Sequence, residues 1–149
     1  MPKLNLPLKG ACRCGHVRIE VSAPPLLTLA CHCTGCQRMS GSAYSLSAAV
    51  PTEGFKVVQG SPVIGGANPD AGHHFCPDCL SWLFTQSKGM DFFVNLRPTT
   101  LDDTSWFSPL VETYTSEKLE WATTPAKHSF EKFPLMEAFG ALIAEYQAM

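Results

Sequence analysis

The seven cysteines of this 149-residue chain lie in three short clusters, and cysteine can bind metal or act as a nucleophile. The clusters are Cys12-Arg13-Cys14, Cys31-His32-Cys33-Thr34-Gly35-Cys36 and Cys76-Pro77-Asp78-Cys79. An odd number of cysteines cannot all pair as disulfides, and disulfides are rare in the cytoplasm. The spacing therefore favours metal ligation.

Two of the clusters contain one closely spaced cysteine pair each. Zinc takes four ligands in a tetrahedron, and a CxC or CxxC pair lets one short chain reversal present two thiolates to the same ion. Cys12 and Cys14 supply one pair, and Cys76 and Cys79 supply the other. We expect these four cysteines to hold a structural zinc ion that joins the start of the chain to its middle.

The remaining cluster, formed by Cys31, Cys33 and Cys36, has no fourth cysteine available to it. An open coordination position is typical of a catalytic zinc ion, which lowers the pKa of the group that it binds. A free thiol has a pKa of about 8.5, so a thiol substrate at such an ion would be a thiolate at neutral pH. The sequence thus predicts a second, catalytic zinc ion in each chain.

Two other interpretations of the three-cysteine cluster remain open. A histidine such as His32, His73 or His74 would complete a second structural zinc site. Alternatively, the cluster would be a metal-free group of redox-active thiols, because CxxC pairs also exchange disulfides.

Charged and polar residues near this cluster are further candidates for a role at the catalytic site. Arg38, two residues after Cys36, could balance the charge of the thiolates or bind a substrate carboxylate through two hydrogen bonds. An exposed surface role fits Arg38 equally well. Arg13 and Arg97 are weaker candidates for the same task. Ser40 could donate a hydrogen bond to a ligand sulfur or cap the local turn.

The composition limits the partners and the compartment. A formal net charge of −2 and the absence of a run of like charges argue against nucleic acid and anionic membranes as partners. The segment from Met1 to Lys9 lacks the apolar core of a secretory signal, and the apolar run near Leu26 to Cys31 is too short to span a bilayer. We expect a cytoplasmic protein with one zinc-binding domain over residues 1–149, and the sequence indicates no particular oligomeric state.

Hydrophobic periodicity predicts a mainly β fold with one proper helix. Alternating residues predict a half-buried strand over His16–Val21. Further strands are expected at Leu27–Ala30, Tyr44–Val50, Phe55–Gln59, His73–Phe75, Leu83–Thr85, Phe92–Leu96 and Val111–Thr115. A single helical turn is expected over Cys33–Met39, ended by Gly41. Apolar residues spaced by three and four predict a C-terminal helix over 134–147, with Pro134 in its first position.

The cysteine clusters and their flanking residues resemble the glutathione-dependent formaldehyde-activating enzyme family, also called the centromere protein V-like family. The likeness lies in Gly10–Gly15, Cys31–Gly41 and His74–Cys79, and more weakly in Val94–Arg97, Leu101–Asp103, Trp121 and His128–Pro134. It spans roughly residues 9–134. Leu80 departs from the pattern, because the family commonly has glycine after the last cysteine.

The resemblance implies a β-tent fold of short antiparallel strands with a C-terminal helix and two zinc sites. It assigns Cys12, Cys14, Cys76 and Cys79 to the structural zinc ion, and Cys31, Cys33 and Cys36 to the catalytic one. It also implies that the protein joins glutathione, a small thiol, to formaldehyde to give S-hydroxymethylglutathione, which would make it a carbon-sulfur lyase.

Two alternatives to this activity remain. A lyase of the same kind could act on another glutathione adduct or small thiol. A non-catalytic zinc-binding module would instead bind a protein or peptide partner, with Phe92, Phe93, Trp106 and Phe107 as exposed anchors, although such aromatic residues more often belong to the core. The two classes differ in one property, because a binding module requires a second zinc ion that is saturated and indifferent to thiols.

Overall fold

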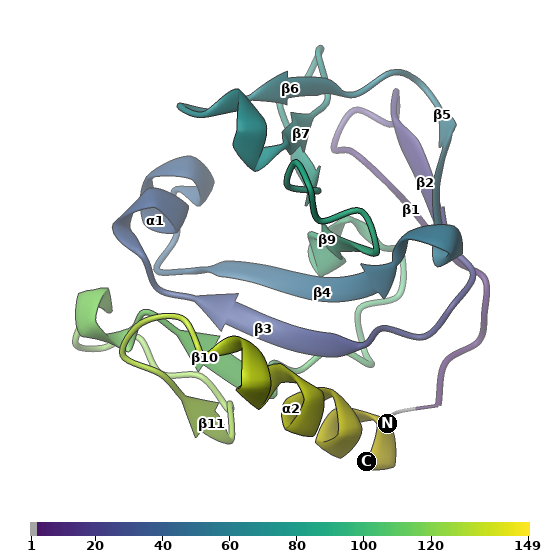
Figure 1. Cartoon of the computed structure of the whole chain (residues 1–149). Helices are drawn as coiled ribbons and strands as arrows, with labels where there is room; N and C mark the ends of the chain where they lie inside the picture. The colour runs from purple at the N-terminus through teal and green to yellow at the C-terminus, as the bar shows by residue number, and fades with distance from the viewer. Residues whose placement is uncertain (1–2) are drawn as a thin grey trace.

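The structure of the protein is a computed structural model that describes residues 3–149. Met1 and Pro2, the first two residues of the Met1 to Lys9 segment, lie outside the described residues. The smaller of two sheets contains β1 (Leu8–Ala11), β2 (Arg18–Val21) and β5 (Phe55–Gln59) in the antiparallel order β1-β2-β5. In Figure 1 this sheet stands at one end of the larger one.

The larger sheet has eight strands in the order β11-β10-β3-β4-β9-β8-β7-β6. Its strands are β3 (Leu27–Cys31), β4 (Ser45–Pro51), β6 (Val63–Gly65), β7 (His73–Phe75), β8 (Trp82–Thr85), β9 (Phe93–Leu96), β10 (Val111–Thr113) and β11 (His128–Ser129). The pairs are antiparallel, except that β10 runs parallel to both β3 and β11. The predicted mainly β fold is confirmed.

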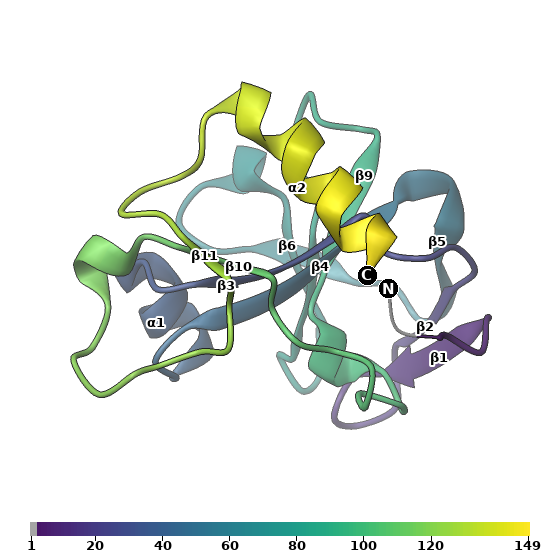
Figure 2. The ribbon, with the colours of Figure 1, turned by 90° about the horizontal axis from the view of Figure 1, so that it is seen from below.

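Within residues 3–149, two α-helices and four short 3-10 turns accompany the sheets. Helix α1 (Thr34–Ser40) ends at Gly41, whose φ of 64° is the left-handed conformation expected there. Helix α2 (Met136–Ala148) packs against β3 and lies across the larger sheet, as Figure 2 shows. It begins after Leu135 rather than at Pro134, so the prediction that Pro134 is the first helical residue was wrong.

The 3-10 turns connect strands at the ends of the sheets. They are η1 (Thr52–Gly54), η2 (Pro69–Ala71), η3 (Pro98–Thr100) and η4 (Thr115–Glu117). Three strands were not predicted: β1, β6 and β11. Each is four residues or shorter, and β1 and β6 both contain a glycine, so their sequences carry little strand periodicity.

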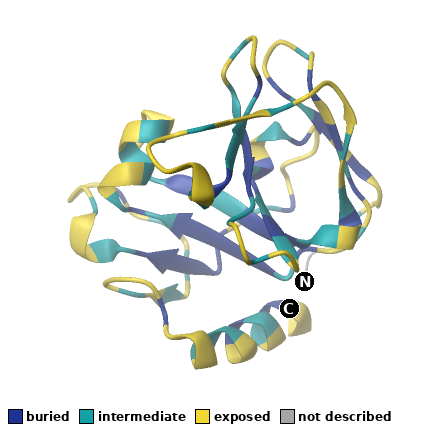
Figure 3. Ribbon diagram, turned by 45° about the horizontal axis from the view of Figure 1, so that its top comes forward, coloured by how far each residue is buried: buried dark blue, intermediate teal, exposed yellow. Residues whose placement is uncertain are grey.

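The buried side chains form two cores. One lies between the smaller sheet and β4, β8 and β9, and it includes Cys12 and Cys76. The other lies beneath α2, where Leu142 and Tyr146 pack on Leu29 of β3. Figure 3 shows the central strands buried and both helices largely exposed. Within residues 3–149, no helix is long and apolar enough to cross a membrane.

The aromatic residues proposed as exposed anchors do not form one exposed group. Trp106 is buried in the first core, and Phe93 and Phe107 pack against the two cores. Phe92 alone of the four is largely exposed, at 64%. Three of these rings help to close the cores, so the four residues do not form the exposed anchors that the partner-binding alternative would use.

Candidate metal centres

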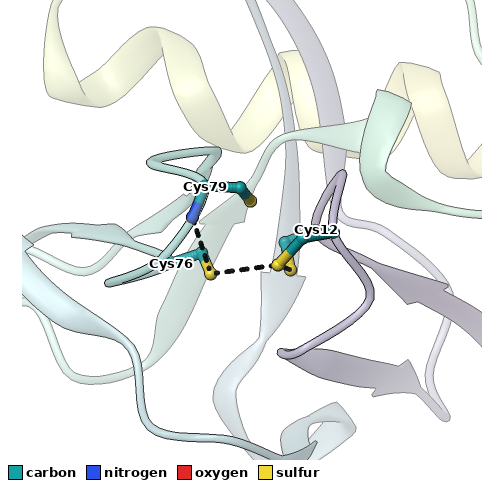
Figure 4. A group of neighbouring side chains, drawn as sticks. Cys12, Cys76 and Cys79 are labelled. Atoms are coloured by element: carbon teal, nitrogen blue, oxygen red, sulfur yellow. Dashed lines mark hydrogen bonds between the residues drawn. The ribbon is translucent and has the colours of Figure 1, made fainter.

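The first centre contains the four cysteines predicted to form a closed site. Cys12 and Cys14 follow β1, and Cys76 and Cys79 lie in the turn between β7 and β8. Their Sγ atoms all lie within 4.8 Å of one another. Figure 4 shows Cys12, Cys76 and Cys79 approaching one another from these two loops. Two chain segments that are distant in the sequence thus meet at one group of sulfurs.

The geometry of this group fits zinc. Four sulfurs at about 2.3 Å from one zinc ion lie about 3.8 Å from each other in a tetrahedron. The Cys12 and Cys14 sulfurs are 3.6 Å apart, and those of Cys14 and Cys76 are 3.8 Å apart. A hydrogen bond from the Ser81 hydroxyl, together with backbone donors, lowers the pKa of Cys79 to about 5 and favours the thiolate that zinc requires.

Backbone amides hold these sulfurs in place. The Val17 N–H donates to Cys12 Sγ over 3.2 Å, and the Cys79 N–H donates to Cys76 Sγ over 3.5 Å. Leu80 then closes the turn with a φ of 60°. A side chain in this left-handed region costs about 1 kcal/mol relative to glycine. Glycine would avoid this cost, which is why it suits the position. The leucine at position 80 still leaves all four cysteines in place.

The second centre contains Cys31, Cys33 and Cys36, whose Sγ atoms also lie within 4.8 Å of one another. Cys31 ends β3, Cys33 is the N-cap of α1, and Cys36 lies in the first turn of that helix. The Cys36 N–H donates to Cys33 Sγ over 3.2 Å. The Thr34 amide and hydroxyl both donate to Glu117 at 3.0 Å, which fixes the start of α1. The predicted helical turn is confirmed.

The donor set of the second centre also suits zinc, with one position left over. Hydrogen bonding by the Cys36 thiol lowers the pKa of Cys31 to about 5, although burial raises it. The neighbouring thiol, Cys31, raises the pKa of Cys36. Among the described residues, no histidine or carboxylate joins the three sulfurs. A metal held here would keep a coordination position for another ligand.

His32 has a different role from the one that a structural zinc site would require. Its ring is fully buried, and Nε2 lies 3.0 Å from Glu112 Oε2 on β10. The hydroxyls of Thr124 and Ser129 donate to the same carboxylate at 2.6 and 2.8 Å. Burial raises the pKa of Glu112, but hydrogen bonds from Thr124, His32 and Ser129 lower this pKa overall. Glu112 therefore anchors the loop that carries the second centre.

Replacing this carboxylate tests its contribution to stability. Glu112→Gln should lower the free energy of unfolding by about 2 kcal/mol near neutral pH, because charge-assisted hydrogen bonds are lost in a buried place. The lowered pKa means that the charged form stabilises the fold above the unfolded value of 4.5, and this contribution is lost as pH falls through the folded pKa. The difference from wild type, measured by denaturant titration, should shrink below about pH 4.

Glu145→Gln is the matched control. The Glu145 carboxylate also meets a histidine, His128, at 2.7 Å, but its side chain is 39% exposed. Exposed ion pairs contribute little, so this variant should change stability by less than about 1 kcal/mol. Equal losses in the two variants would show that Glu112 has no special structural role.

Two neighbouring cavities share lining residues, and one of them includes part of the second centre in its wall. A mainly apolar one of about 300 Å³ includes Cys31 and Cys36 in its wall. A more polar one of about 430 Å³ is lined by Ser40, Ser42 and Tyr44. Ser45, Trp82 and Arg97 line both cavities and so separate them. The open side of the three-cysteine group is therefore next to space for a ligand.

Arg97, and not Arg38, lies at this junction. Its guanidinium carbon is 4.0 Å from the centroid of the Trp82 ring. Burial lowers the pKa of Arg97 to about 10, whereas the nearby Cys36 and Cys31 thiols raise it. Its Nε is buried and has no hydrogen-bond partner within residues 3–149. Arg97 directly follows β9 (Phe93–Leu96) and continues the alternation of Phe93 and Asn95 toward the cavity, which was the available signal in the sequence.

Other predicted residues lie away from the sulfurs or act locally. Arg38 is exposed on α1 and forms no ion pair with any residue in the described range 3–149. The Ser40 hydroxyl donates to the Cys36 carbonyl over 2.7 Å, so it caps the turn. Arg13 lies in the loop of the first centre, where its amide donates to Ser81.

The fold and the two centres define a class: a mainly β protein with one complete four-cysteine group and one three-cysteine group that opens on a cavity. The chain belongs to the glutathione-dependent formaldehyde-activating enzyme family, whose sequence profile matches residues 7–117. No curated protein matches the chain.

A crystal structure of a Rhodobacter sphaeroides protein, determined in a structural genomics programme, has a similar fold. It is 24% identical, with a TM-score of 0.51, and the match covers 63% of this chain and 87% of the other. This likeness supports the fold.

Proposed function

We propose that the protein is a zinc-dependent carbon-sulfur lyase that forms and cleaves S-hydroxymethylglutathione. The observation that carries the proposal is the three-cysteine group, which has no fourth protein ligand in the described chain and places Cys31 and Cys36 in the wall of a cavity. Membership of a family described as glutathione-dependent and formaldehyde-activating supports the same activity. A saturated second zinc ion, as a binding module requires, has no support in the ligand set.

The seven cysteines would form two zinc sites with different roles. Cys12, Cys14, Cys76 and Cys79 would hold a structural zinc ion, and Cys31, Cys33 and Cys36 would hold a catalytic one. When bound, zinc at the second centre supplies a lowered thiol pKa, so that glutathione is nucleophilic at neutral pH. Free cysteines throughout the chain suit a reducing compartment, which supports a cytoplasmic location.

The chain itself orients the reactants. Arg97 offers an unpaired donor to an anionic group, either a glutathione carboxylate or the oxygen that gains charge during addition. The hydroxyls of Ser40, Ser42 and Tyr44 line the polar cavity, where they suit the peptide part of glutathione. In the reaction a carbon-sulfur bond forms, the carbonyl π pair moves to oxygen, and oxygen takes the thiol proton. No oxidant or reductant is needed.

The test must separate enzymatic from spontaneous addition, because thiols add to formaldehyde unaided. We would measure the exchange rate between carbon-labelled formaldehyde and its glutathione adduct by NMR, with and without the protein. Acceleration that disappears on chelation and returns with zinc is the expected result. An exchange rate that the metal-loaded protein leaves unchanged would contradict the proposal.

Arg97→Gln should lower kcat/KM for the adduct by roughly tenfold to a hundredfold, because a hydrogen bond to a charged group contributes about 1.5–3 kcal/mol. The NMR exchange assay gives the rate, and elemental analysis should show unchanged metal content. Arg38→Gln is the matched control on the exposed face of α1. A loss in Arg38→Gln without a loss in Arg97→Gln would return the charge-balancing role to Arg38.

A further inference from the structure

The floor of the apolar cavity is one face of the two central strands. Residues pair directly across β3 and β4: Leu27 with Ala49, Leu29 with Ser47 and Cys31 with Ser45. All six line the cavity. Alternate residues of a strand point to the same side of a sheet, so the floor runs straight from Cys31 toward Leu27. Its length is about 13 Å, from four strand residues at about 3.3 Å each.

The opposite wall comes from the C-terminal part of the chain. Phe133, Met136, Phe139 and Ile143 line the cavity, and all four lie beyond residues 7–117, the part that matches the family profile. Phe133 and Phe139 contact each other, with ring centroids 5.4 Å apart. The rim is exposed and apolar, because Phe92 and Met136 are 64% and 70% exposed. Segments outside the part of the chain that matches the family profile therefore shape the cavity.

This cavity is poorly matched to formaldehyde alone. Its volume is about 300 Å³. A small molecule such as water takes about 30 Å³ of liquid volume, so a molecule of two heavy atoms would leave most of the space empty. Glutathione carries two carboxylates and an ammonium group, and such charges are costly to place against leucine and phenylalanine side chains. These mainly apolar walls therefore favour a hydrocarbon group as the ligand.

We propose that the apolar cavity holds the hydrocarbon group of an aldehyde, so that the enzyme forms and cleaves hemithioacetals of apolar aldehydes. The inference rests on the proposed function and extends its substrate class. The aldehyde carbon meets the thiol sulfur beside Cys31 and Cys36, and the chain extends along the strands toward Leu27. The new carbon-sulfur bond uses the thiol electron pair, and the former carbonyl oxygen keeps the π pair and takes the thiol proton.

The first test measures binding without turnover. S-hexylglutathione and S-methylglutathione differ only in their hydrocarbon group, and calorimetric titration of the zinc-loaded protein gives both affinities. Burial of the extra methylenes should make the hexyl compound bind at least about tenfold more tightly. Equal affinities would overturn the inference, even if formaldehyde exchange is accelerated.

The second test blocks the cavity at its middle. Ser47→Leu places a larger side chain on the floor, opposite Leu29. The ratio of kcat/KM for hexanal to that for formaldehyde should fall about tenfold, and the preference for S-hexylglutathione should disappear. Ser47→Ala keeps the space and should retain both preferences. Met136→Asp changes an exposed residue of the rim, so it should weaken hexyl binding without disturbing the buried side chains.

The outcomes separate this inference from the proposed function. Accelerated formaldehyde exchange with no hexanal or hexyl preference would refute the inference alone. Preferential hexyl binding without acceleration of any aldehyde reaction would refute the lyase activity and keep the apolar binding site. A preference for hexanethiol over glutathione, with no preference for hexanal, would place the hydrocarbon on the thiol and overturn the inference.

Discussion

Replacing Cys76 with serine is expected to lower the free energy of unfolding by about 4 kcal/mol or more, or to prevent folding. Cys76 is fully buried, and its sulfur accepts the Cys79 amide within the four-cysteine group. Loss of one ligand opens a site that joins two distant loops, and structural zinc contributes its binding energy directly to folding. Thermal unfolding followed by circular dichroism gives the size of the effect.

The control is metal removal from the wild-type protein. If zinc stabilises the fold through this centre, chelation should reproduce the loss seen in Cys76→Ser, and chelation of the variant should add little. A Cys76→Ser protein that keeps wild-type stability and metal content would show that the four cysteines are core residues and not zinc ligands.

Cys33→Ser is expected to give a folded protein that loses one of two metal ions and at least about a hundredfold in kcat/KM. Replacing groups that only contact a ligand costs 10–100-fold, so loss of a ligand itself should cost at least as much. Cys33 lies at the half-buried N-terminus of α1, outside both cores. Elemental analysis and the NMR exchange rate, measured on the same sample, report the two losses.

Thr34→Ser serves as a matched change in the same turn, because serine keeps the hydroxyl that donates to Glu117. That variant should retain metal and most of the activity. If Cys33→Ser and Cys76→Ser instead lose stability to the same extent and both keep activity, the division into structural and catalytic centres is wrong.

Most strands followed from their sequences because burial on one face imposes a period of two. Residues 16–21 show this alternation, and β2 (Arg18–Val21) lies within them. The end of α1 at Gly41 was also predictable, since a left-handed C-cap favours glycine. By contrast, β11 has two residues and exists because it pairs with β10, a partner that no local pattern reveals.

The division of the seven cysteines into four and three was determined by the sequence alone, because ligand number and pair spacing are local properties of zinc chemistry. Only the tertiary structure decided what surrounds the second centre. It placed Arg97 rather than Arg38 at the cavities, and it engaged His32 with Glu112. It also brought α2 against β3 to close an apolar cavity beside Cys31. These features depend on contacts between segments far apart in the chain, which spacing along the sequence does not encode.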